Sequence, residues 1–487
     1  MVIRPLTIGV MAALLAACAV GPDFVRPTTD TPARFAREPA TAAIAPQQAA
    51  PQQATATDTA FWRGFGDAQL TALVEDALSA NHDLRIALAN YDRANALLRG
   101  AKFDYFPTLT GSGQASDNRA SADQQPGVPR ADRDGKAYSA QVDAAWELDV
   151  FGRIRRNVEA NRADAGAGAA DLQSAQVAIV GDVARTYLEL RGLQERLRVA
   201  HENADNQRET LQLVEARFNA GRDSEFDTAR ARAQLESTSA RIPALEAAIA
   251  ADMHRLAVLT GRTPDALIGE LSEVKPLPAV PAGIDPGTPG ELLRRRPDVA
   301  AAEGRLHAAT ARIGVATADL FPRFTLGGLI GSQAIDSGDL FQRSSETRLV
   351  ALGIDWSFLD IGRVRARIKA ADADAEGELA RYQQTVLLAL EDTENALVRF
   401  DRTREEDAHL ERAASDSTRA AQLARVRFEA GATSLLEVLD AERNRLQAED
   451  AFADGRTRSV TSAVALYKAL AGGWPQMLPT REKIASR

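Results

Sequence analysis

The sequence predicts a mainly α-helical chain with four β-strands, built from one structural unit that occurs twice. Three features of the 487 residues lead to this fold class. Identical residues recur at constant spacings, proline is absent from 130–242 and from 323–474, and two pairs of short segments alternate apolar with polar residues. The composition agrees, because only 5% of the residues are aromatic and much of the 45% hydrophobic content is alanine, which favours helices.

Composition and charge exclude several classes of function. Asp and Glu number 67 against 58 Lys and Arg, a net charge of −9, so the chain offers nucleic acid no overall basic surface. One cysteine excludes an intrachain disulfide framework and a thiolate zinc site. The five histidines lie far apart, and no P-loop or GxSxG motif occurs. We therefore expect no enzymatic activity and no metal or other cofactor.

The N-terminus predicts export and lipid attachment. Residues 1–17 have the features of a signal peptide, with an apolar run from Leu6 to Leu15 that is too short to span a bilayer. Cys18 follows two alanines, which resembles the lipobox of bacterial lipoproteins, where the cysteine carries a covalent lipid. A buried structural cysteine is the alternative. Ala19 is not the aspartate that retains such lipoproteins at the inner membrane, so we expect the outer membrane of a Gram-negative bacterium.

An internal repeat organises the rest of the chain. Seven residues recur 215 positions later, namely Leu78, Asp83, Ala87, Ala101, Asp104, Phe106 and Pro107. Six more recur 210 positions later, namely Trp146, Gly152, Arg153, Phe218, Ala220 and Gly221. Such constant spacings indicate a duplication. The expected segments are a proline-rich lipidated strap at 18–60, a first repeat at 61–270, a second repeat at 271–472 and a C-terminal tail at 473–487.

Each repeat should contain a very long helical hairpin, at about 152–260 and 362–470. Apolar and small residues recur at alternating spacings of three and four from Leu172 to Phe218, a heptad pattern typical of packed helices. Nearly 70 residues of helix would extend about 100 Å. A shorter helix is expected at Phe61–Leu70.

Each repeat should also contain a β-hairpin, at about 106–148 and 322–358, with polar loops at 117–135 and 333–346. Strands of about ten residues with one apolar and one polar face are typical of membrane β-barrels, although a soluble hairpin packed on the helices would share the pattern. The apolar residues are Tyr138, Ala140, Val142, Ala144, Trp146 and Leu148 in the first copy, and Val350, Leu352, Ile354, Trp356 and Phe358 in the second.

Four strands cannot close a barrel by themselves. About eight strands are needed even for a barrel filled by side chains, and an open sheet edge in lipid leaves backbone groups without hydrogen-bond partners. Three chains would supply twelve strands around a polar lumen. The sequence therefore predicts a homotrimer that contacts outer-membrane lipid and forms a channel.

Five motifs are specific when they are taken together. They are Cys18-Ala-Val-Gly-Pro-Asp-Phe-Val-Arg-Pro27, Phe61-Trp-Arg-Gly-Phe-Gly-Asp-Ala-Gln-Leu70, Trp146-Glu-Leu-Asp-Val-Phe-Gly-Arg153, Leu293-Arg-Arg-Arg-Pro-Asp-Val299, and Phe428-Glu-Ala-Gly431 with Leu436-Glu-Val-Leu-Asp440. With them the chain resembles the TolC-like outer membrane efflux protein family, in the lipoprotein branch that serves resistance-nodulation-division pumps. The resemblance implies a trimeric channel-tunnel, in which a 12-stranded outer-membrane barrel joins a long α-helical periplasmic barrel.

The resemblance also implies a passive exit duct. Substrates expelled by an inner-membrane, proton-driven resistance-nodulation-division transporter would reach the duct through a periplasmic adaptor protein, as in multidrug resistance. A type I secretion channel and a non-conducting structural envelope lipoprotein stay open as alternatives. The sequence names neither the substrate nor the cognate adaptor and transporter.

In the family that the chain resembles, inward-curving hairpins close the periplasmic end with acidic residues. The matching gate residues are Leu436, Glu437 and Asp440. Three chains would bring six carboxylates around one axis, where like charges raise one another's pKa. Glu437 has an alternative role, because Ser434 and Glu437 have the spacing of a capping box at a helix start.

The first copy differs from the second at these gate positions. The residues that correspond to Glu437 and Asp440 are Asp227 and Arg230, so Arg230 could pair with Asp440 as a latch. Gly221 and Gly431 suit the C′ position that follows a helix. We expect the hairpin tips around these two glycines to contact the adaptor.

Overall fold

The computed structural model describes residues 19–30, 32–36, 60–280 and 284–471. The expected signal peptide, Cys18 and the C-terminal tail lie outside the described residues. The chain divides into two compact units. One unit combines 1–28, 91–168 and 301–383, and the other combines 29–90, 169–300 and 384–487. Both copies of the repeat contribute segments to each unit.

The described α-helices range in length from 4 residues in α7 to 69 in α10. The α-helices are α2 Ala68–Ala80, α3 His82–Phe103, α4 Arg153–Asn219, α5 Glu225–Ser239, α6 Arg241–Leu259, α7 Ile268–Leu271, α8 Pro289–Arg295, α9 Pro297–Ala318, α10 Ile361–Glu429 and α11 Leu435–Ala469. The 3-10 helices are η2 Phe61–Phe65, η3 Arg130–Asp132, η4 Arg343–Ser345 and η5 Phe358–Asp360. None of the described helices is both long and apolar enough to cross a membrane.

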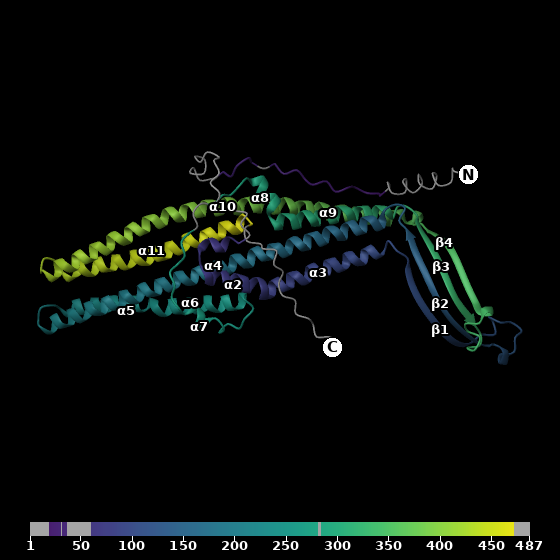
Figure 1. The fold of residues 1–487 in the computed structure, drawn as a ribbon, viewed down its shortest axis with the longest axis horizontal. Helices are drawn as coiled ribbons and strands as arrows, with labels where there is room; N and C mark the ends of the chain where they lie inside the picture. Colours follow the sequence, from purple (N-terminus) through teal and green to yellow (C-terminus); the bar gives the residue numbers. More distant parts are fainter. Residues whose placement is uncertain (1–18, 31, 37–59, 281–283, 472–487) are drawn as a thin grey trace. The chain divides into compact units, whose positions relative to one another are not determined.

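The first unit contains one antiparallel sheet in the order β1-β2-β3-β4 (Figure 1). The strands are β1 Thr108–Arg119, β2 Asp134–Leu148, β3 Arg323–Ala334 and β4 Glu346–Asp355. Both predicted hairpins are confirmed, and β2 pairs with β3 to join the two copies. The prediction extended the last strand too far. β4 ends at Asp355, and Phe358 begins η5.

The strand register places most of the large apolar residues on one face of this sheet, while Leu329 and Leu349 lie on the other. Leu148, Phe324 and Ile354 lie opposite one another in a row across β2, β3 and β4. A second row contains Trp146, Leu326 and Leu352, and a third pairs Val142 with Ile330. Several of these side chains are more than half exposed, including Ile330 at 76% and Ile354 at 64%. The alternation seen in the sequence therefore produces an apolar face that this chain leaves uncovered.

Equivalent tryptophans occupy equivalent positions in the two hairpins. Trp146 donates its indole N–H to the carbonyl of Tyr105 at 3.1 Å, and Trp356 donates to the carbonyl of Leu320 at 3.1 Å. Each acceptor follows the helix that leads into the hairpin. These bonds hold the end of one strand against the start of the other in both copies.

Residues 19–24 are fixed to this same unit. The backbone N–H of Val20 donates to the carbonyl of Phe151 at 3.1 Å. Arg156, which is 4% exposed, donates to the carboxylate of Asp23 at 2.6 Å. Phe24 stacks on His307 with ring centres 4.4 Å apart. Residues 19–24 are thus held next to the junction of β2 and α4.

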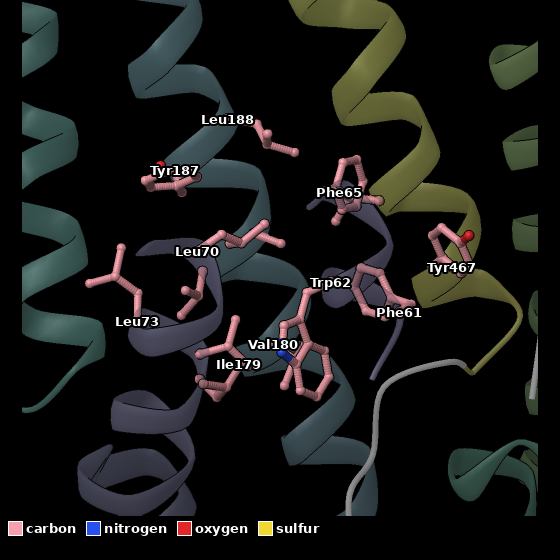
Figure 2. Packing of buried hydrophobic residues seen from close by; sticks show 14 of the residues in the cluster. Phe61, Trp62, Phe65, Leu70, Leu73, Ile179, Val180, Tyr187, Leu188 and Tyr467 are labelled. Carbon is pink, nitrogen blue, oxygen red and sulfur yellow. The ribbon is translucent and has the colours of Figure 1, made fainter. Parts of the chain in front are cut away.

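The second unit contains the largest apolar core. Figure 2 shows Phe61, Trp62 and Phe65 of η2 among side chains of α2, α4 and α11. Phe61 stacks on Tyr467 with ring centres 4.7 Å apart. Arg191 is fully buried beside this core, where it donates to the side chain of Gln69 at 2.5 Å and to the backbone of Glu273 at 2.7 Å. Neutral acceptors therefore bind both terminal nitrogens of the buried guanidinium, while its Nε has no hydrogen-bond partner among the described residues.

The segment predicted as one helix from Phe61 to Leu70 is two helices. Gly66 adopts a φ of +67°, in the left-handed region, and ends η2. Asp67 then caps α2 by accepting bonds from the backbone N–H groups of Gln69 and Leu70. The prediction was wrong here because the glycine and the capping aspartate fall within an apolar pattern that suits a single helix.

The long helices are confirmed, with 67 residues in α4 and 69 in α10. The heptad residues from Leu172 to Ala204 are mostly buried, whereas Phe218 at the end of the pattern is 42% exposed. The returning arm of the second copy, α11, is one helix of 35 residues. The returning arm of the first copy is broken into α5 and α6 at Ala240, shortly before Pro243, which has no N–H for the helical bond.

Replacing Trp62 with alanine should lower the free energy of unfolding by about 3–5 kcal/mol. Trp62 is 2% exposed and its indole Nε1 is buried without a partner among the described residues, so the loss is one of packing. Thermal and denaturant unfolding in detergent, followed by circular dichroism, measures the change. The control is Phe226→Ala, because Phe226 is 67% exposed. Equal effects of both changes would contradict the assigned core.

Candidate gate at the helical hairpin tips

The tips of the two helical hairpins have the same backbone geometry. Gly221 has a φ of +68° and Gly431 a φ of +72°, which L-residues with side chains rarely adopt. The N–H of Gly221 donates to the carbonyl of Phe218, and that of Arg222 to the carbonyl of Arg217. The second copy repeats both bonds at positions 431 and 432. These are Schellman turns, and both glycines occupy the C′ position predicted for them.

Both copies contribute to one apolar cluster behind the tips. Its members are Val214, Ala231, Phe428, Leu435, Val438 and Leu439. Phe428 is 8% exposed, and the guanidinium of Arg217 from the other copy lies 4.8 Å from its ring centre. Arg217 also donates to the carboxylate of Asp223 at 2.9 Å. The two hairpins are therefore joined by apolar packing and by a cation–π contact.

The predicted gate residues lie on the side of α11 that faces away from this cluster. Leu435, Val438 and Leu439 are buried, whereas Leu436 is 47% exposed and Glu437 is exposed. The side chain of Asp440 is 48% exposed. Since Asp440 lies four residues after Leu436, the two side chains share one face of the helix. An apolar side chain and two carboxylates are thus available to groups outside this chain.

The capping box occurs in the first copy and is absent from the second. Ser224 donates to Asp227 through its hydroxyl at 2.6 Å and its N–H at 3.1 Å, and these bonds lower the pKa of Asp227 below its usual range, with a further contribution from Arg230. Ser434 caps α11 without a side-chain bond, and Glu437 instead accepts a bond from the Thr433 hydroxyl. The capping-box alternative for Glu437 is therefore wrong.

Asp440 pairs with a residue that the sequence analysis did not name. Arg443, one turn further along α11, lies 3.2 Å from the carboxylate of Asp440. The predicted partner Arg230 instead lies over the ring of Phe226, 5.6 Å from its centre. The spacing of three residues on one helix could have indicated the pair with Arg443. Within one chain, the latch of Arg230 with Asp440 is replaced by this local pair.

No group of three or more metal-binding side chains occurs in the described parts of the chain. The arrangement of charges at the tips combines Glu437, which accepts from Thr433, with Asp440, which pairs with Arg443. It can present charge and apolar surface to a solute or to another protein.

Comparison with known proteins identifies the family. The family described as outer membrane efflux protein matches residues 73–262 and 288–472. The starts of these two segments lie 215 positions apart and their ends 210, the two spacings of the internal repeat. The matched residues cover more than half of the chain and include both hairpin tips.

Individual relatives agree over nearly the full length. The chain is 32% identical to the outer membrane protein OprJ of Pseudomonas aeruginosa, over 96% of each protein. It is 34% identical to the pyoverdine export outer membrane protein OpmQ of Pseudomonas putida, over 87% of this chain and 90% of OpmQ. The solved structure of the outer-membrane channel OprN has a TM-score of 0.86 and 41% identity, and the match covers 94% of this chain and all of OprN. The chain therefore belongs to the outer membrane efflux protein family.

Proposed function

We propose that the chain forms a homotrimer that serves as the outer-membrane exit duct of a tripartite efflux pump. The apolar face of the four-stranded sheet carries this proposal. Its rows of exposed Leu, Ile, Val and Trp suit lipid, and its outer strands β1 and β4 each have one neighbour among the described strands. Lipid cannot satisfy the remaining backbone groups, so further strands must come from other copies. Three copies give the twelve strands of a hollow barrel.

The duct would conduct substrates passively, and it would receive them from partners on the periplasmic side. A resistance-nodulation-division transporter in the inner membrane supplies the energy from protons, and a periplasmic adaptor connects it to the duct. We place the adaptor contact at the tips around Gly221 and Gly431, where the Schellman turns leave both glycines exposed. OpmQ is named for pyoverdine export and other relatives for toluene or antibiotic efflux. The substrate of this chain is not fixed by these names.

The gate of the proposed duct is built from Leu436, Glu437 and Asp440. Their exposure on one side of α11 supports a ring around the threefold axis, because nothing in the described chain covers them. Arg443 holds Asp440 in place at 3.2 Å. Arg230 and Asp227 of a neighbouring chain would complete the ring. A type I secretion channel would share the fold, and a structural lipoprotein would share the long helices, but the efflux relatives favour the pump.

Lipid attachment at Cys18 should be visible in the mature protein. Cells grown with radiolabelled palmitate should incorporate label into the wild-type chain and not into Cys18→Ala, because the thiol is the site of acylation. Intact-mass spectrometry should also show loss of residues 1–17 in the wild type. Equal labelling of both proteins would contradict the assignment.

Replacing Asp440 with alanine should raise the conductance of the trimer in planar bilayers several-fold. The change removes three carboxylates from the proposed ring and frees Arg443. The wild-type currents should be small and cation-selective, because a negative constriction favours cations. Glu411→Gln, which removes an exposed carboxylate from α10, is the matched control and should leave the conductance unchanged.

Two outcomes of this measurement would count against the proposal. Equal conductance of Asp440→Ala and the wild type would remove Asp440 from the gate. The absence of conductance in both proteins, despite correct insertion, would favour a structural lipoprotein over a duct.

A further inference from the structure

A cavity of about 510 Å³ that opens to the surface lies in the second unit, between α4, the α5–α6 break and α11. Its volume falls within the range of small-molecule sites, which is about 300–1,000 Å³. The break supplies the space, because Ala240 ends α5 and α6 starts again with Pro243 in its first turn. In the second copy the position of Pro243 is occupied by Ala453, and α11 continues unbroken. The cavity therefore lies where the first copy has a helix break and the second copy has a continuous helix.

The charges that line this cavity are mostly positive. Arg196, Arg241 and Arg443 line it, and Asp450 is the one carboxylate among the lining residues. Asp450 already accepts from Arg196 at 2.8 Å and from Arg241 at 3.4 Å. Arg196 also donates to Asp454 at 3.0 Å, so all three of its guanidinium nitrogens have acceptors. Arg241 contacts Asp450 through one nitrogen and keeps N–H donors for another group. The cavity retains donors for an additional acceptor.

The remaining lining is partly polar and partly apolar. Asn203 and Thr238 are 3% and 8% exposed, so their polar atoms belong to the wall of the cavity and not to the outer surface. Val199, Leu245 and Leu446 add an apolar portion. Cavities with a few placed polar groups on an apolar wall are typical of ligand sites.

The lining charges do not recur in the other copy. The positions that correspond to Arg196, Arg241 and Asp450 are Glu406, Ala451 and Ala240. Residues needed only to pack the helical hairpins should be similar at corresponding positions of the two copies. The arginine cluster belongs to the cavity that the α5–α6 break creates.

We propose that this cavity binds a small organic anion, with a carboxylate or phosphate group held by Arg241 and Arg443 and an apolar portion against Leu245 and Leu446. Arginine suits such oxyanions because its N–H groups form paired, charge-assisted hydrogen bonds with them. The site is separate from the proposed gate, yet Arg443 belongs to both. A bound anion competes with Asp440 for Arg443 and thereby loosens the gate, a step that rests on the proposed function.

Phenyl phosphate is a suitable probe, titrated by calorimetry into the full chain in phosphatidylcholine nanodiscs. Saturable binding is expected, with one probe per chain. Arg241→Gln should weaken it about tenfold, since a hydrogen bond between charged groups is lost, and Ala244→Phe should abolish it by filling the cavity. Arg232→Gln should bind like the wild type, because Arg232 is 60% exposed, pairs with Glu215 and is absent from the lining.

Three results would overturn the anion site. They are the absence of saturable heat in the wild type, equal binding by wild type and Arg241→Gln, and equal binding of neutral benzyl alcohol. Circular dichroism of each variant confirms that the helices are intact. Binding heat does not depend on conduction, so a protein that binds the probe but stays silent in bilayers would contradict the duct and leave the anion site standing. Conductance that rises with the probe in the wild type, and less in Arg241→Gln, would support the link to Asp440.

Discussion

The backbone hydrogen bonds of the sheet edges are the constraint on which the rest depends. Among the described strands, β1 and β4 each pair on one side only, while the register places an apolar face beside those open edges. In water an open edge is solvated, but in lipid each unpaired N–H and C=O costs several kcal/mol. One chain alone therefore cannot complete the hydrogen bonds of this sheet in a membrane. The proposed trimer follows from this deficit, and so does a duct, because twelve strands enclose more space than their side chains fill.

The duplication repeats the backbone and varies the side chains. Both tips end in the same Schellman turn, and both hairpins anchor a tryptophan on a carbonyl of the preceding segment. The residues after the turns differ, since Asp227 is bound within a capping box whereas Glu437 and Asp440 stay exposed on α11. One copy thus stabilises its tip through a local cap. The other leaves two carboxylates available for contacts outside the chain.

Much of the fold could be predicted because its signals are periodic and long. The heptad pattern, the alternating strands and the C′ glycines each depend on local spacing, and their elements are confirmed. The errors have local causes as well. Gly66 and Asp67 divide a segment whose apolar pattern suits one helix, and Pro243 divides an arm that was expected to be continuous.

The candidate site was harder to predict, because side-chain pairing depends on rotamers and on neighbours that sequence spacing leaves open. Glu437 had the spacing of a capping box, yet it accepts a bond from Thr433. Arg230 had the charge to pair with Asp440, yet it lies over Phe226. In both cases the side chain contacts a residue four positions earlier in the chain. A spacing of three residues along one helix predicts a pair such as Asp440 with Arg443 better than a match of opposite charges on different helices does.

Arg443 connects the two places where the copies differ most. On one side Arg443 pairs with Asp440, and the first copy has Arg230 at the position of Asp440. On the other side Arg443 lines the cavity beside the α5–α6 break, and the second copy has a continuous helix in place of that break. A guanidinium has enough donors to serve an acceptor on each side, but its position shifts when one acceptor gains strength. In the proposed duct, a gate that depends on Asp440 would therefore respond to the occupant of the cavity, because Asp440 and that occupant would both bind Arg443.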